Sequence, residues 1–150
     1  MPELTFRNIT ATPSDPVDTW GFEGLLTAVD RGQLPHWRRI AEAMSEDPWG
    51  PVAHRLDEVA AVANDRGAVA LLLGARERAR QRAEHEERAI VAAELRDLVS
   101  STGLTTSEFA ARIGTSRTRL SSWLNGHVAP RSTMLVRARR LGQSHTNTGG

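Results

Sequence analysis

The sequence predicts an all-α protein with a small N-terminal helical domain, a long connecting helix and a C-terminal bundle of short helices. Three observations lead to this prediction. Apolar residues recur at spacings of three and four along most of the chain, which is the pattern of amphipathic helices. Proline and glycine fall between these stretches, where they would start or stop helices. Residues 68–101, by contrast, contain one glycine and no proline, so they should form one long helix.

The composition excludes several classes of protein. The 150 residues include no cysteine, which rules out disulfides, thiolate catalysis and cysteine-ligated metal sites. Aromatic residues make up 5% of the chain and tyrosine is absent, which argues against a stacking platform for single-stranded nucleic acid. No run approaches about 18 apolar residues and Met1-Pro2-Glu3 is not a basic leader, so we expect a cytoplasmic, nucleoid-associated protein without membrane contact.

Charge is distributed unevenly along the chain. All 19 basic side chains are arginine. Residues 1–66 hold 6 arginines and 11 acidic residues, whereas residues 103–150 hold 7 arginines and one acidic residue, Glu108. An acidic first half with a basic end is typical of a chain that meets a polyanion at the basic end. From charge alone, a solvated arginine surface is an equally good interpretation.

The first 18 residues should form an extended or flexible arm. They are rich in threonine, proline and aspartate, and proline at 13 and 16 interrupts regular structure. Leu4 and Phe6 alternate with polar residues, which suits a short strand or an arm docked on the rest of the protein.

Residues 19–73 should form a helical oligomerisation or partner domain. Three amphipathic segments are expected, with starts at Asp18, Pro35 and Pro51 and stops at Gly32, Asp47-Pro48 and Gly67. Trp20, Trp37 and Trp49 should fill the core. The apolar stripes of these helices must be buried against each other or against a second copy, so we expect a homodimer through them.

Residues 74–101 should form a connecting helix that leads into the first helix of the C-terminal domain. Within it, residues 76–88 are polar almost all round, and opposite charges three or four residues apart, such as Arg80 and Glu84, would stabilise an exposed helix.

Residues 104–126 have the pattern of two short helices around a tight corner. Thr105 and Glu108 form a capping box, which would start the first helix at Thr106. Gly114 can adopt the left-handed conformation that such a corner requires. This arrangement is the helix-turn-helix unit, so the C-terminal bundle is predicted to be a helix-turn-helix bundle.

The second short helix has one buried and one outward face. Ser116 would cap it and Gly126 would close it, with Leu120, Trp123 and Leu124 facing inward. Its outward residues carry no acid: they are Arg117, Thr118, Arg119, Ser121 and Ser122. Slim polar side chains with arginines suit a helix that enters the major groove of duplex DNA.

On these residues the segment resembles the Xre and phage-repressor family of helix-turn-helix domains, over roughly residues 88–141. The matching residues are Leu104-Thr105, Glu108 to Gly114, Ser116-Arg117, Leu120-Ser121, Trp123, Asn125-Gly126, Pro130 and Ser132. The resemblance implies a compact helical bundle in which residues 116–125 are the recognition helix. It also implies base contacts by Arg117, Thr118 and Ser122, and phosphate contacts by Thr106, Ser116, Arg119, Asn125 and Arg131.

These features predict a sequence-specific transcriptional regulator on double-stranded DNA, acting as a repressor. Two alternatives stay open: an antitoxin whose N-terminal domain binds a toxin, and a nucleoid or phage protein of low sequence specificity. No catalytic, metal or cofactor site is expected, because the five histidines lack metal-site spacing and no nucleotide or nucleophile motif occurs. Residues 142–150 should be a disordered tail.

Overall fold

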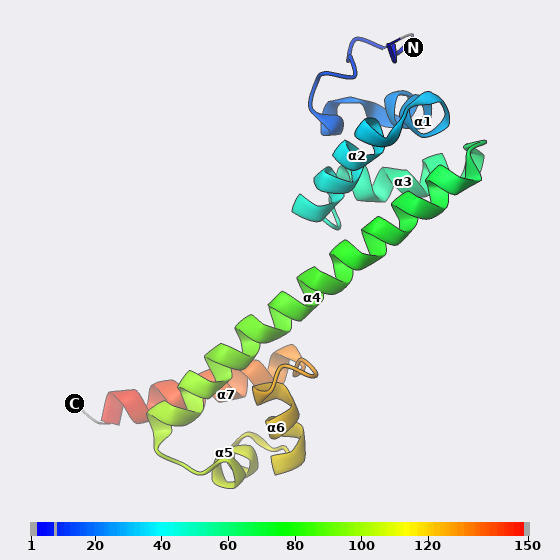
Figure 1. Ribbon diagram of the computed structural model, residues 1–150. Coiled ribbons are helices and arrows are strands. Elements are labelled where there is room, and N and C mark those ends of the chain that lie inside the picture. Colours follow the sequence, from blue (N-terminus) through cyan, green and yellow to red (C-terminus); the bar gives the residue numbers. More distant parts are fainter. Residues whose placement is uncertain (1–2, 8, 149–150) are drawn as a thin grey trace. The chain divides into compact units, whose positions relative to one another are not determined.

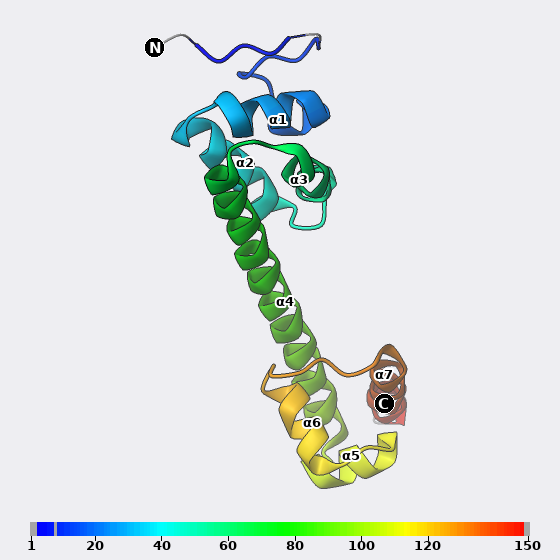
Figure 2. The same cartoon turned by 90° about the vertical axis from the view of Figure 1, so that its right-hand side faces the viewer.

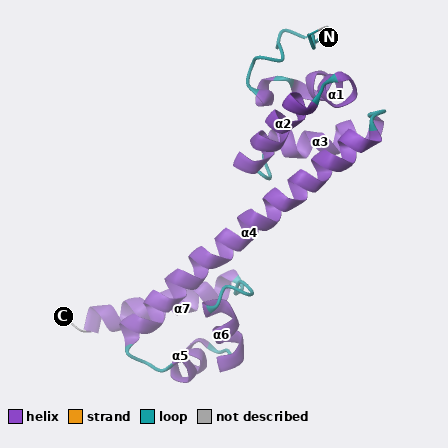
Figure 3. Cartoon of the chain, viewed as in Figure 1, coloured by secondary structure: helices purple, strands orange, loops and turns teal. Residues whose placement is uncertain are grey.

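The computed structural model describes residues 3–7 and 9–148, with side chains up to His145. Over these residues the chain forms helices and loops and no strand, which confirms the predicted all-α class (Figures 1 and 3). The elements are η1 (Val17–Thr19), α1 (Gly21–Arg31), α2 (Leu34–Glu46), α3 (Pro51–Val62), α4 (Arg66–Thr102), α5 (Thr106–Ile113), α6 (Arg117–Leu124) and α7 (Ser132–Thr148). The chain divides into two compact units, residues 1–83 and 84–150.

The first unit packs α1, α2, α3 and the beginning of α4 around one core. The fully buried large side chains of this core are Trp20, Leu25, Val29, Ile40, Met44, Leu56, Val59, Val69 and Leu72. These side chains belong to the apolar stripes that were predicted to be buried either within the domain or against a second copy of the chain. Because the unit buries them internally, a dimer would have to use other side chains.

The N-terminal arm docks on this core without forming a strand. The ring of Phe6 meets the ring of Trp20 edge-on, with centroids 5.2 Å apart. The indole of Trp20 donates a hydrogen bond of 3.0 Å to the carbonyl of Asp15. Arg39 also donates to the carbonyls of Pro13 and Asp15. These contacts identify residues 3–7 and 9–16 as part of the unit, while residues 1, 2 and 8 lie outside the described residues.

Most predicted helix ends are confirmed, and two are wrong. Gly32 follows α1, and prolines open α2 and α3. Gly67 does not stop α3; it lies inside α4, which begins at Arg66. The side chain of Asp65 accepts the backbone N–H of Ala68 at 3.0 Å, so an N-cap starts a new helix here. The predicted start at Asp18 also shifts, because Asp18 lies in η1 and α1 begins at Gly21.

Trp49 does not fill the core as predicted, because 51% of its surface is exposed. It lies in the loop between α2 and α3, where the guanidinium of Arg80 is 5.9 Å from its ring centroid. Arg80 Nε also donates to the carbonyl of Pro48 at 2.9 Å. The loop is therefore attached to α4 by an arginine, and its tryptophan stays at the surface.

Arginines of α4 bind the first unit where the sequence predicted a free connecting helix. Arg76 donates to the carbonyl of Ala53 at 2.9 Å and pairs with Asp57 at 2.8 Å. With Arg80, it extends the first unit to residue 83, beyond the predicted boundary at residue 73. The predicted pairing of Arg80 with Glu84 is not among the ion pairs of the described residues.

The second unit is a bundle of the C-terminal part of α4 with α5, α6 and α7 (Figure 2). Its buried core consists of Leu95, Phe109, Ala110, Ile113, Leu120, Trp123, Met134 and Ala138. The structure continues α7 to Thr148, through residues for which the sequence predicts a disordered tail, and residues 149 and 150 lie outside the described residues. Gly142 is buried against α4, and a Cβ there would lie 2.5 Å from a methyl carbon of Leu98. Close packing at this glycine explains why the helix continues past Leu141.

Candidate nucleic-acid interface

The corner between α5 and α6 has the predicted geometry. Thr105 caps α5 by accepting the N–H of Glu108 at 3.2 Å. Gly114 has a φ of 83°, in the left-handed region, and its N–H bonds back to carbonyls at the end of α5. The capping box is only half formed, because the Glu108 carboxylate accepts the Thr105 hydroxyl at 3.0 Å and does not accept the Thr105 N–H. One glycine conformation therefore fixes the turn between the two helices.

Helix α6 is eight residues long and is held by two buried anchors. The side chain of Leu120 is fully buried and Trp123 is 8% exposed, as the predicted helix phase required. Ser116 caps the helix by accepting the N–H of Arg119 at 3.1 Å. Gly126, with a φ of 73°, follows its C-terminal end.

The predicted base-contacting residues lie on the outer part of this helix. Arg117 and Thr118 are exposed, and Ser122 is half-buried one turn later. Of the predicted phosphate-contacting residues, Ser116, Arg119, Asn125 and Arg131 are exposed and Thr106 is half-buried. The hydroxyl oxygen of Ser116 is used by the cap, but its hydrogen can still donate to an anion.

A shallow cavity brings three of these residues together. Arg119 and Ser122 of α6 and Arg131, directly before α7, all line a cavity of about 280 Å³. In the described part of the chain, neither guanidinium makes a hydrogen bond or an ion pair. Both positive charges are therefore available to an anionic ligand.

Three arginines of this unit have a different role, which the sequence did not reveal. Arg137 Nη1 donates to the carbonyl of Ile113 at the end of α5, at 3.2 Å. Arg96 Nη1 donates to the carbonyl of Leu124 at the end of α6, at 2.6 Å, and Arg88 Nε donates to that of Gly126 at 3.3 Å. Cations at helix C-termini stabilise carbonyls that lack a helical partner. These three arginines thus position the two short helices.

A fourth arginine forms an ion pair within the bundle. Arg139 Nε lies 2.6 Å from an oxygen of Glu94, which joins α7 to α4. This hydrogen bond lowers the pKa of the Glu94 carboxyl below its ordinary value and raises that of Arg139. The basic count of residues 103–150 therefore overstates the charge that is free for a ligand.

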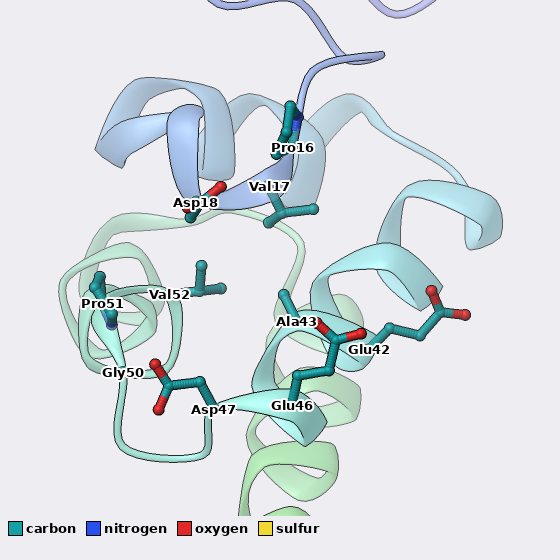
Figure 4. Close-up of a pocket in the computed structure, with 10 residues that line it drawn as sticks. All are labelled: Pro16, Val17, Asp18, Glu42, Ala43, Glu46, Asp47, Gly50, Pro51 and Val52. Carbon is teal, nitrogen blue, oxygen red and sulfur yellow. The ribbon is translucent and has the colours of Figure 1, made fainter.

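The first unit contains a hollow of about 400 Å³ of a different character (Figure 4). Val17, Ala43 and Val52 point into it, and the carboxylates of Asp18, Glu42, Glu46 and Asp47 lie around its edge. Three acidic residues at the end of α2 and just after it, Glu42, Glu46 and Asp47, thus lie at this hollow, whereas Asp57 of α3 is paired with Arg76.

Within the described residues, no three His, Cys, Asp or Glu side chains lie together in a way that could hold a metal ion. None of the described helices combines the length and apolar character needed to cross a membrane.

Comparison with known proteins identifies the second unit only. No curated protein and no solved structure matches the chain. The family model described as helix-turn-helix matches residues 94–142, which run from the end of α4 into α7. This match coincides with the capped α5, the left-handed corner and the anchored α6, so the C-terminal third of the chain is similar, in sequence and in local geometry, to helix-turn-helix domains of the Xre type.

Proposed function

We propose that the protein is a sequence-specific repressor that reads duplex DNA with α6 in the major groove. One observation carries this proposal: the first turn of α6 exposes Arg117, Thr118 and Arg119, and no acidic residue occurs after Glu108. An acid-free helix start with slim neighbours lets the backbone approach the groove, where arginine can bind guanine or phosphate.

We assign base contacts to Arg117, Thr118 and Ser122, and phosphate contacts to Thr106, Ser116, Arg119, Asn125 and Arg131. The exposure of the arginines supports these roles. So does the capping of α6 by Ser116, since a helix N-terminus favours an anion.

We also propose that the protein acts as a homodimer on a two-fold site. One recognition helix covers only a few base pairs. A dimer links two DNA-binding units, so once the first is bound, the second is held at a high effective concentration near the DNA and the affinity rises. The first unit exposes four large apolar side chains that could take part: Leu34, Trp49, Val62 and Leu71. Sedimentation of the full chain should give twice the 16.4 kDa of one chain. Leu71→Ser should weaken the dimer, whereas a monomeric full chain would contradict this assignment.

A second candidate function is an antitoxin that represses its own synthesis. It is favoured by the burial of the amphipathic stripes within the first unit and by the carboxylates around its hollow, which a different protein with basic side chains would contact. A monomer in solution, together with a neighbouring reading frame that encodes a toxic protein neutralised by this chain, would favour this candidate.

Selection of bound sequences from random duplex DNA tests the proposed function. We expect one enriched site, whereas a low-specificity nucleoid or phage protein would enrich none. Arg117→Ala should cost about 1–3 kcal/mol on the enriched site and relax specificity at one base pair. The matched control is Arg112→Ala, which removes an exposed arginine from α5. A loss for Arg117→Ala that is equal on all sequences would make Arg117 a phosphate contact.

A further inference from the structure

The cavity beside the recognition helix has the lining of a small binding site. Its apolar wall is formed by Trp123, Val128, Pro130 and Met134. The side chains of Arg119 and Arg131 also line the cavity. Val128 is 55% exposed although it is a large apolar side chain. The cavity volume of about 280 Å³ lies just below the range for sites that hold drug-sized molecules, roughly 300–1,000 Å³, so only a small ligand would fit.

The polar groups of this cavity are incompletely satisfied. The two guanidinium groups have no hydrogen bond or ion pair within the described residues. The hydroxyl of Thr115, which also lines the cavity, is buried and finds no hydrogen-bond partner there. Buried polar atoms are normally paired, so hydrogen bonding is incomplete in the wall of this cavity as well as at its two guanidinium groups.

We infer that this cavity binds a small organic carboxylate with a compact apolar body. The carboxylate would accept hydrogen bonds from Arg119 and Arg131, since guanidinium groups match the geometry of carboxylates. The apolar body would cover Val128 and the edge of Trp123. Acetate would pair with the arginines but leave the apolar wall uncovered, and a neutral aryl amide would cover the wall without pairing with the arginines as an anion. An arylcarboxylate should therefore bind better than either.

Binding of such a molecule would regulate the proposed DNA-binding activity, and this step rests on the proposed function. Arg119 and Arg131 are the residues assigned to DNA phosphates. A carboxylate that occupies both would compete directly with duplex DNA, so the ligand would act as an inducer.

The first test uses the full chain without DNA and benzoate as the probe. Titration should shift the NMR signals of the Trp123 indole and the Val128 methyl groups, with a dissociation constant on the order of 1 mM for so small a ligand. Acetate and benzamide should produce no saturable shift at these residues. Arg131→Gln should weaken benzoate binding about tenfold, whereas Arg112→Gln, which changes an arginine outside the cavity, should leave it unchanged. Equal binding of acetate, equal loss with Arg112→Gln, or shifts confined to other residues would overturn the inference.

The second test measures competition with the duplex found by selection. At 10 mM probe and a dissociation constant of about 1 mM, benzoate should raise the apparent Kd for DNA about elevenfold, compared with acetate at the same ionic strength. Acetate is the needed control because salt itself weakens DNA binding. A protein that binds DNA but not benzoate refutes this inference alone. A protein that binds benzoate but no duplex refutes the proposed function and leaves the cavity assignment standing.

Discussion

Replacement of Arg137 by methionine separates a positioning role from a DNA contact. Arg137 Nη1 donates a hydrogen bond of 3.2 Å to the carbonyl of Ile113 and a weaker one of 3.8 Å to the sulfur of Met134, and it lies 3.2 Å from where a Cβ on Gly114 would be. A hydrogen bond from a charged donor contributes about 1.5–3 kcal/mol, but the Arg137 side chain is exposed and solvent screens it. We therefore expect a loss of about 1 kcal/mol in the free energy of unfolding of the second unit.

A loss of this size is measurable in a unit that covers residues 84–150. It corresponds to a fall in Tm of about 4–8 °C for a small domain, and the NMR signal of the Trp123 indole reports the second unit alone. Arg140→Met is the matched control, because this exposed arginine of α7 has no partner among the described residues, so its Tm should barely change.

Affinity for DNA should fall in the Arg137→Met variant without a change in its salt dependence. An arginine that neutralises a phosphate contributes about −0.9 to the slope of log Kobs against log salt concentration. Arg119→Gln should remove one such contribution, whereas Arg137→Met should remove none. An unchanged Tm together with a slope reduced by about one would refute the reasoning and make Arg137 a phosphate contact.

Three further predictions concern the stability of the second unit. Trp123→Ala should cost roughly 3–5 kcal/mol, most of the stability of a small domain, and an unchanged thermal melt would show that the phase of α6 is wrong. Thr115→Val removes the buried hydroxyl without changing side-chain shape, so urea unfolding should show a gain of about 1–2 kcal/mol; a loss would mean that the hydroxyl is hydrogen-bonded in solution. The lowered pKa of Glu94 means that its pair with Arg139 stabilises the fold above the unfolded pKa of about 4.3, and that this stabilisation is lost as the pH falls through the folded pKa. Urea midpoints of the protein and of Glu94→Gln should therefore differ by a constant amount between pH 5 and 7 and converge as the pH falls below that unfolded pKa; a difference that does not shrink on further acidification would contradict this cause.

The sequence predicted those parts of the fold that depend on local chemistry. The cap at Thr105, the left-handed Gly114 and the inward pair Leu120 and Trp123 follow from short-range rules, and the structure agrees with them. Gly67 misled because a glycine can lie inside a helix once an aspartate, here Asp65, supplies an N-cap directly before it.

The contacts between residues far apart along the chain could not be predicted from the sequence. Nothing local distinguishes Arg137, which binds a helix end, from Arg131, which has no partner in the described residues, because the difference depends on which elements pack together. The same holds for Trp49, which the structure places beside Arg80 on the surface, 31 residues away along the chain. The cavity that joins Arg119 and Arg131 likewise exists only after α6 and the loop before α7 have packed.

The contact between Gly142 and Leu98 determines how the DNA-binding unit can be isolated. The family match covers residues 94–142, but Arg88 and Ala92 lie before it and α7 continues after it to Thr148. A fragment cut to the limits of the match would lose the hydrogen bond from Arg88 to Gly126 and would end α7 at the residue that packs on Leu98. A fragment of the second unit should therefore run from residue 84 to residue 148. A shorter fragment would be less stable, because it would lose these contacts at its two ends.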